Sequence, residues 1–260
     1  MKKLVCLLAA VMCAGLIAGC GGGQSKKAAA PEKRTVIRFG TNADFAPFEF
    51  QKEGSKEYAG FDMDLARAIG SKLGVKVEIN NLPFDGLIPA LSSGNIDAAI
   101  SGMTITEARS KQVTFSAPYY QSGLIVMVKK DNNNIKSIKD LEGKKIAVQI
   151  GTTGATEAHK VKNAKVTDFN SNAEACLELR NGGVDAVVSD LPVLSYFLKQ
   201  GGNDFAKLVG QPLHAEEYGI AMKKDNAKLA KEINKAIEDL KKSGEFDKIY
   251  KTWFNDTPKK

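Results

Sequence analysis

The sequence contains few of the residues on which metal, redox and nucleophilic chemistry depend. Its 260 residues include 2 histidines, 4 cysteines and 1 tryptophan. His159 and His214 are far apart, and neither belongs to a metal-ligand spacing. Ser116 and Ser189 lack the Gly-x-Ser-x-Gly context of an activated serine. We therefore expect no metal site, no cofactor and no nucleophile of the hydrolase type.

An excess of charge of one sign is also lacking. Lysine and arginine number 37 against 30 acidic residues, for a net charge of +7. This excess is too small and too dispersed to predict nucleic acid as a partner. The apolar share of 43% and the charged share of 26% are ordinary for a folded protein. The length permits one large domain or two lobes, each with its own core.

Long apolar runs are absent except for one at the N-terminus. Two lysines precede residues 4–17, which are apolar but too few to span a membrane comfortably, and Ala18-Gly19-Cys20 follows. This pattern predicts an export signal at 1–19. A cysteine directly after small residues resembles a bacterial lipobox, so we expect Cys20 to carry lipid. The alternative is a plain secretory peptide that is cut elsewhere.

Lipidation at Cys20 would place the mature chain on the outer face of the cell membrane or in the periplasm. Residues 20–34, rich in Gly, Ala, Ser and Lys, are predicted to be a flexible tether. Cys6 and Cys13 would leave with the signal, so Cys176 is the single ordinary thiol and no intrachain disulfide is expected. Cys176 lies in an apolar helical stretch, where we expect it to be a small buried side chain.

After the tether, strand and helix patterns alternate, which is typical of an α/β protein with a largely parallel sheet. Each helix pattern ends near glycine or a polar residue, as helices do. Strands are predicted at 36–40, 75–79, 96–100, 124–128, 145–149, 184–189 and 218–222, and helices at 62–73, 87–91, 173–179, 192–198 and 226–242.

A short repeat suggests two lobes of similar construction. Residues 94–100 read Gly-Asn-Ile-Asp-Ala-Ala-Ile, and residues 182–188 read Gly-Gly-Val-Asp-Ala-Val-Val. Each copy follows an apolar helical stretch, although a motif this short also arises by chance. Crossings near 119–123 and 214–218 would form a two-strand hinge with a cleft between the lobes. The predicted boundaries are 35–120 with 217–260 for the first lobe, and 121–216 for the second.

Five motifs then identify a resemblance. They lie at 41–50, 60–65, 84–91, 101–109 and 115–120. Their order and separations resemble family 3 of the bacterial extracellular solute-binding proteins, the amino-acid receptors of ATP-binding-cassette (ABC) importers. The similarity covers roughly residues 35–256, and the glutamine-binding receptors of the family look especially similar. It implies a periplasmic-binding-protein fold of type II, with two lobes and a ligand cleft between them.

A receptor for free amino acids needs a fixed cation and a fixed anion, because its ligand carries a carboxylate and an ammonium. Arg109 presents a planar fork of donors that suits a carboxylate. Asp190 follows a predicted strand, at the end where open α/β sheets bind ligands. The resemblance implies that these two residues bind the α-carboxylate and the α-ammonium. The alternatives are an Arg109 paired with Glu107 or solvent, and an Asp190 that caps helix 192–198.

The resemblance implies further contacts around these charges. Backbone and hydroxyl groups would meet the ligand's α groups, the start of a helix near residue 155 would offer N–H groups, and aromatic rings would enclose the aliphatic stem. The residues in these roles are Ser101, Gly102, Thr104, Thr152, Thr153, Phe45 and Phe84.

The distal part of the pocket decides which amino acid fits. Asn42, Gln149 and Ser189 match positions where the glutamine receptor carries aspartate, lysine and histidine, so three charged or titratable groups are replaced by neutral ones. A neutral polar pocket suits an amide, since its hydrogen bonds are satisfied without stranding a charge. We therefore expect glutamine or another neutral polar amino acid. Arginine, lysine or histidine is the alternative, with Asp44 or Glu49 as the carboxylate.

These inferences predict a monomeric receptor that closes on a free L-amino acid and delivers it to an ABC permease. It would not be an enzyme. A cyclohexadienyl or arogenate dehydratase on the same fold needs a general acid near the reacting ring, and Asn42, Gln149 and Ser189 offer none. After the transport receptor and the dehydratase, the third class of function is a sensory receptor domain that signals instead of feeding transport.

Overall fold

The computed structural model describes residues 34–255 and residue 258. The expected signal peptide, the lipid site at Cys20 and the tether up to residue 33 lie outside these described residues. Within the described part, no helix combines the length and apolar character that a membrane span requires.

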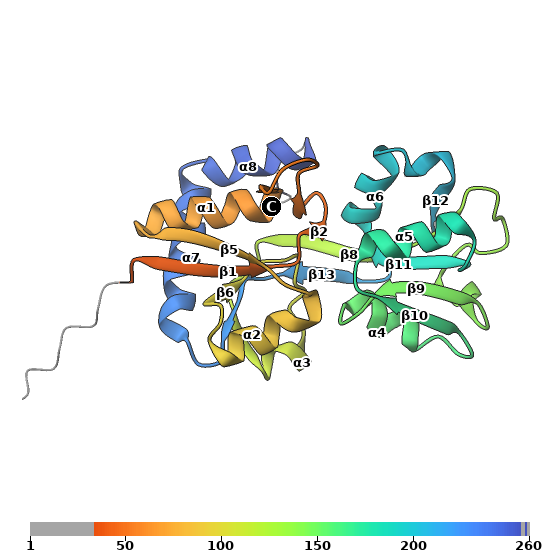
Figure 1. Ribbon diagram of the computed structural model, residues 1–260, viewed down its shortest axis with the longest axis horizontal. Coiled ribbons are helices and arrows are strands. Elements are labelled where there is room, and N and C mark those ends of the chain that lie inside the picture. The colour runs from red at the N-terminus through yellow and green to blue at the C-terminus, as the bar shows by residue number, and fades with distance from the viewer. Residues whose placement is uncertain (1–33, 256–257, 259–260) are drawn as a thin grey trace, which may run out of the picture. The chain divides into compact units, whose positions relative to one another are not determined.

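The first sheet contains strands from both ends of the chain. Its order is β5 (Lys76–Asn81), β1 (Val36–Thr41), β6 (Ala98–Ala99), β14 (Ala221–Lys223) and β7 (Val113–Phe115). β1 pairs in parallel with β5 and β6, whereas β14 is antiparallel to β6 and β7. The late strand β14 therefore lies inside a sheet that is otherwise built from the first part of the chain (Figure 1). We call this sheet and the helices that pack on it the first lobe.

Helices with one apolar face cover the first sheet. They are α1 (Phe61–Leu73), α2 (Leu87–Ser93), α7 (Ala227–Lys242) and α8 (Glu245–Phe254). α1 ends at Gly74, whose φ of 64° is readily adopted only by glycine. α7 begins at Asn226, which accepts a hydrogen bond from the backbone N–H of Leu229. α1 and α7 contribute much of one apolar core together with strand β1.

The second sheet is built from the middle of the chain. Its order is β10 (Lys165–Phe169), β9 (Lys145–Gln149), β11 (Ala186–Asp190), β8 (Tyr120–Lys129) and β12 (Ala206–Val209). The helices packed around it are α4 (Thr153–His159), α5 (Asn172–Asn181) and α6 (Leu191–Lys199). Ser171 and Glu174 form a reciprocal capping box at the start of α5. We call this sheet and its helices the second lobe.

Two strands connect the lobes. β8 is long enough to leave the second sheet, and its first residues pair antiparallel with β13 (Ala215–Tyr218). On the first-lobe side, the backbone N–H of Tyr119 donates to the carbonyl of Tyr218, and Thr104 forms an isolated bridge with Tyr218. Figure 1 shows β8 and β13 running side by side between the two sheets. The two-strand connection makes this a two-lobed α/β fold.

The structure corrects several details of the sequence-based predictions. The sheets are mixed and not largely parallel, because β14, β8 and β12 are antiparallel to their neighbours. The strand predicted at 218–222 is divided between β13 and β14, and the one predicted at 96–100 keeps only the two residues of β6 in its ladder. The sequence did not predict strands β7, β10 and β12 or helix α8. Other elements that were not predicted are β2 (Asp44–Phe45), β3 (Glu49–Gln51), β4 (Tyr58–Ala59), α3 (Glu107–Ser110) and the 3₁₀ turns η1 (Phe84–Gly86), η2 (Ile138–Leu141) and η3 (Gly202–Asp204).

Cys176 confirms its predicted role. It is a free thiol with no exposed surface, packed in a core cluster of the second lobe. Burial raises the pKa of this thiol to about 12, so it remains protonated and unreactive at neutral pH.

Candidate functional site

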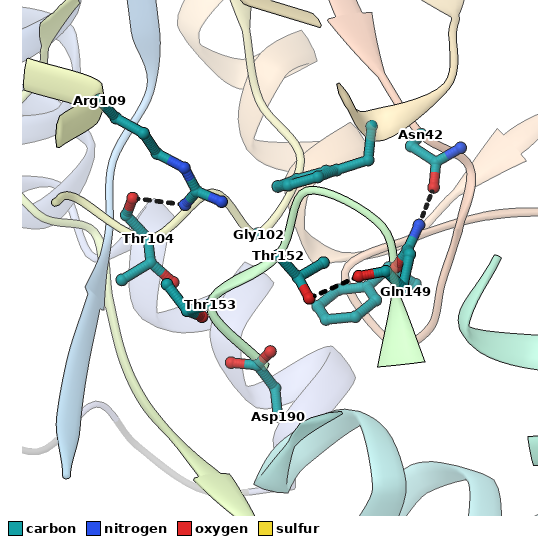
Figure 2. A pocket seen from close by; sticks show the side chains of 10 residues that line it. Asn42, Gly102, Thr104, Arg109, Gln149, Thr152, Thr153 and Asp190 are labelled. Atoms are coloured by element: carbon teal, nitrogen blue, oxygen red, sulfur yellow. Dashed lines mark hydrogen bonds between the residues drawn. The ribbon is translucent and has the colours of Figure 1, made fainter. Parts of the chain in front are cut away.

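Ten of the twelve residues expected to contact a ligand line one pocket (Figure 2). They come from the ends of β1, β9 and β11, from β2, from the loop after β6, and from the short helices α3, α4 and η1, so both lobes contribute. The lining residues are Asn42, Phe45, Phe84, Gly102, Thr104, Arg109, Gln149, Thr152, Thr153 and Asp190.

Arg109 supplies the cation of the pocket and is held by groups from both lobes. Its Nη1 donates to the carbonyl of Thr104 at 2.7 Å, and its Nη2 donates to the carbonyl of Gly151 at 2.9 Å. The guanidinium carbon lies 5.3 Å from the centre of the Phe84 ring, within range of a cation–π contact. Burial lowers the pKa of Arg109, and the nearby carboxylates of Glu216 and Asp190 oppose that shift.

The alternative partner for Arg109 is engaged elsewhere. The carboxylate of Glu107 pairs with Lys111 at 2.8 Å, on an exposed face of α3. The guanidinium of Arg109 is therefore fixed at the pocket, and its hydrogen-bond partners are neutral carbonyl oxygens. A carboxylate that enters the pocket would be the first anion in direct contact with it.

Asp190 supplies the anion and ends strand β11. Its Oδ1 accepts hydrogen bonds from Tyr218 Oη at 2.5 Å and from Ser122 Oγ at 2.8 Å. Burial, followed by the neighbouring charge of Glu216, raises the pKa of Asp190 to about 7. Asp190 occupies the N-cap position of α6 but makes no side-chain capping bond, so the capping alternative is wrong. With a pKa of about 7, Asp190 is only partly ionised at neutral pH, and an incoming ammonium would favour its ionised form.

Aromatic rings and a glycine shape the wall of the pocket. Phe45 and Phe84 are both buried. Gly102 has a φ of 50°, and a Cβ built on it would lie 3.0 Å from the Phe45 ring. Its backbone N–H donates to the buried Oδ2 of Asp62 at 2.8 Å. Only glycine lets the chain pass this close to the ring without displacing it.

An amide pair from the two lobes forms another side of the pocket. Gln149 Nε2 donates to Asn42 Oδ1 at 2.7 Å, as Figure 2 shows. Asn42 Nδ2 also donates to the carbonyl of Leu82, and Gln149 Nε2 lies 3.3 Å from the carbonyl of Asn170. These side chains offer neutral donors and acceptors to a distal polar group.

Three threonines complete the lining. Thr152 is the N-cap of α4: its Oγ1 accepts from the N–H of Ala155 at 3.1 Å and donates to the carbonyl of Gln149 at 2.8 Å. The hydroxyls of Thr104 and Thr153 both donate to a single carboxylate oxygen of Glu216, at 2.9 and 3.0 Å.

Two expected residues, Ser101 and Ser189, do not line the pocket. Ser101 is buried behind it, where its Oγ accepts from the N–H of Asn42 and donates to Glu49 Oε1. Ser189 precedes Asp190 in β11, and consecutive side chains of a strand point to opposite faces. Because Asp190 faces the pocket, Ser189 faces away from it.

The two carboxylates held in reserve for a basic ligand also lie outside the lining. Glu49 is fully buried, and burial followed by repulsion from Asp62 raises its pKa well above the usual value. The pKa of Asp62 is raised by burial to about 6. Burial raises the pKa of Asp44, and the nearby Ser171 hydroxyl and backbone N–H groups at the start of α5 oppose that shift. None of these carboxylates lines the pocket.

The sequence analysis missed Glu216. This residue is 4% exposed and contacts two pocket threonines. The signal that would have found it is the alternation Ala215-Glu216-Glu217-Tyr218, which places Glu216 on the same face as the buried Tyr218.

The fold and the paired charges in the cleft between the lobes are those of an amino-acid-binding protein of the periplasmic type. Residues 37–256 match the model of the bacterial extracellular solute-binding proteins, family 3, and the chain belongs to this family. A probable histidine-binding protein from Neisseria gonorrhoeae is 38% identical, covering 98% of this chain and 96% of that protein. The ABC transporter glutamine-binding protein GlnH from Bacillus subtilis is 34% identical and covers 99% of both.

Solved structures of similar sequence share the fold. A structure of an ancestral arginine-binding protein bound to arginine is 50% identical, with a TM-score of 0.83, and covers 85% of this chain and 99% of that one. A structure of an ancestral arginine-binding protein bound to glutamine is 49% identical, with a TM-score of 0.81, and covers 86% and 99%. The resemblance inferred from the five motifs is thereby confirmed.

We predict that Arg109→Ala abolishes useful amino-acid binding. Without the guanidinium, the ligand carboxylate would lack its counter-charge in the pocket, and breaking a buried charge pair of this kind costs on the order of 3 to 5 kcal/mol, which is more than about a hundredfold in affinity. Isothermal titration calorimetry measures the change. Lys111→Ala, two residues away on the exposed face, is the control and should bind normally. A folded Arg109→Ala protein of unchanged affinity would remove Arg109 from the site.

We also predict that affinity rises with pH up to about 7 and then levels off. Asp190 has a pKa raised to about 7 in the free protein, and an ammonium favours its ionised form, so binding releases a proton below that pH. Affinity should therefore fall by up to about tenfold per pH unit below 7. Titrations between pH 5 and 9 test this. Asp190→Asn should bind weakly and without the slope; a slope that survives this substitution would assign it to another group.

Proposed function

We propose that this chain is an exported lipoprotein receptor that captures a free L-amino acid and delivers it to an ABC permease. The observation that carries the proposal is the presence of Arg109 and Asp190 on one pocket, contributed by different lobes. An α-amino acid has the matching pair of opposite charges at fixed spacing. Arg109 would bind the α-carboxylate and Asp190 the α-ammonium.

Capture would occur by closure of the lobes. Arg109 already reaches the carbonyl of Gly151, and Asn42 reaches Gln149, so the described arrangement contains contacts between lobes that an open form would lose. A ligand that touches both lobes favours the closed form by adding interactions that exist only there. We propose lobe boundaries at 35–120 with 217–260 and at 121–216, and bending at β8 and β13.

The favoured ligand is glutamine or another neutral polar amino acid. The Asn42–Gln149 pair supplies an amide donor and an amide acceptor, which suit a terminal carboxamide. Asp44 and Glu49, the carboxylates that a basic side chain would use, lie outside the lining, and Glu49 is hydrogen-bonded to Ser101. A buried guanidinium or ammonium would then lack a full counter-charge.

A basic amino acid, arginine in particular, is the second candidate. The observation in its favour is that similar solved structures contain arginine in one case and glutamine in another. Oxygen acceptors of amides, together with the faces of Phe45 and Phe84, also accommodate a guanidinium.

The remaining elements of the proposal concern partners and chemistry. The membrane would be reached through lipid on Cys20, the permease would bind the closed receptor, and the protein would act as a monomer. It would not act as an enzyme, since the Asn42–Gln149 side of the pocket offers amides and no general acid. Incubation with prephenate should leave the substrate unchanged.

A thermal-shift screen of the twenty amino acids tests the function directly. The protein would first be unfolded and refolded to remove bound ligand, because ligand bound to the native state raises its stability. We expect glutamine to give the largest shift in melting temperature, and calorimetry would then measure its affinity. A largest shift with arginine, lysine or histidine would replace glutamine by the second candidate. No shift with any amino acid would overturn the proposal.

Asn42→Asp should move selectivity toward basic ligands. The new carboxylate would pair with a distal cation, whereas the neutral carboxamide of glutamine offers it no charge to pair with, so the ratio of arginine to glutamine affinity should rise by about tenfold or more. Calorimetric titration with both amino acids measures the ratio. Asn42→Ser, which adds no charge, is the control. An unaltered ratio in a folded Asn42→Asp protein would place the distal group elsewhere.

A further inference from the structure

Glu216 is a buried carboxylate at the junction of three segments. It lies in β13, one of the two strands that connect the lobes, and its side chain is 2% exposed. Oε2 accepts hydrogen bonds from Thr104 Oγ1 at 2.9 Å and from Thr153 Oγ1 at 3.0 Å. Oε1 lies 3.1 Å from Nε2 of His214, a half-exposed residue of the same connection.

The two threonines belong to different lobes. Thr104 follows β6 of the first sheet, whereas Thr153 opens α4 on the second sheet. Glu216 therefore bridges the lobes through one oxygen atom. Both threonines line the pocket, so this bridge forms part of the wall that a ligand would touch.

The direction of these hydrogen bonds decides what the threonines offer to a ligand. A hydroxyl has one hydrogen, and in Thr104 and Thr153 it is donated to Glu216. Each Oγ1 can then only accept a further hydrogen bond. Oxygen atoms that only accept suit an ammonium and not a carboxylate, which matches the placement of Asp190 on the same pocket.

The negative charge of Glu216 also favours a cation at the pocket. Among the influences on the two fixed charges of the pocket, its carboxylate raises the pKa of Asp190 and opposes the lowering of the pKa of Arg109. The carboxylate of Glu216 thus lies close enough to interact electrostatically with Arg109 and Asp190, although Glu216 does not itself line the pocket.

We propose that Glu216 is a positioning residue that sets the ammonium specificity of the site and links it to closure. By holding the hydroxyl hydrogens of Thr104 and Thr153, it turns their oxygens into acceptors for the α-ammonium, and it forms this arrangement only when the lobes come together. The inference rests on the proposed function and adds a determinant of ligand class to it.

The test compares two probes that differ only at the α-carbon. Glutamine and glutaramic acid (4-carbamoylbutanoic acid) share the side chain and the carboxylate, but the second lacks the ammonium; arginine and 5-guanidinopentanoic acid form the matching pair if arginine is the ligand. Affinities would be measured by calorimetry on the refolded wild-type protein, on Glu216→Gln and on Glu217→Gln. Glu217 is the control because it is exposed on the same strand and undergoes the same change of charge.

In Glu216→Gln, affinity for the amino acid should fall by about tenfold or more, while affinity for the probe without an ammonium changes little. The ratio of the two affinities should therefore shrink by about tenfold, and Glu217→Gln should keep the wild-type ratio. If Glu216 had a purely structural role, Glu216→Gln would weaken the binding of both probes by the same factor. Equal losses, or an unchanged ratio in a folded variant, would overturn the proposal.

Thr153→Val keeps the proposal falsifiable if Glu216→Gln does not fold. This variant removes one hydroxyl of the bridge at nearly constant volume, and it should lower the same ratio through loss of one acceptor. An unchanged ratio would contradict the assigned role. A wild-type protein that binds neither amino acid would overturn the proposed function itself and this inference with it, whereas normal wild-type binding with an unshifted ratio would overturn only the role of Glu216.

Discussion

The pocket depends on keeping a partly buried cation and a buried anion facing a common space without direct contact between them. Neither Arg109 nor Asp190 has an ion-pair partner of its own among the described residues. Removing such charges from water is unfavourable unless hydrogen bonds replace the lost hydration. Carbonyl oxygens provide them for Arg109, and Tyr218 and Ser122 provide them for Asp190. The pocket is thus prepared for a molecule that carries both opposite charges.

A second buried network supports the first-lobe side of the pocket. Asp62 accepts from Tyr119 Oη at 2.8 Å and from the N–H of Gly102 at 2.8 Å. Its neighbour Glu49 accepts from Ser101, which in turn accepts from the N–H of Asn42. Burial raises the pKa of both carboxyls, and the charge of Asp62 raises that of Glu49 further, since nearby buried charges of the same sign repel each other. Carboxyls outside the pocket thereby hold the backbone that forms its wall.

The buried networks around Asp190, Glu216 and Asp62 all contact the two connecting strands, β8 and β13, or the residues next to them. Tyr218 ends β13 and binds Asp190, Glu216 joins threonines of both lobes, and Tyr119 precedes β8 and binds Asp62. The side chains that we propose to recognise a ligand's charges are therefore hydrogen-bonded to the segments that connect the lobes. Under the proposed function, binding and closure would be coupled through these direct hydrogen bonds.

Local patterns in the sequence determined the longer helices such as α1, α5 and α7 and the order of the motifs, because these follow from the chemistry and spacing of neighbouring residues. The choice of Arg109 and Asp190 rested on their side-chain chemistry together with the resemblance to family 3. Tertiary structure alone decided the rest. It placed β14 inside the first sheet, turned Ser189 away from the pocket, and joined Asn42 to Gln149 over 107 residues and Thr104 to Glu216 over 112. Periodicity reports which face of an element is buried, but two groups so far apart meet only through the packing of whole lobes.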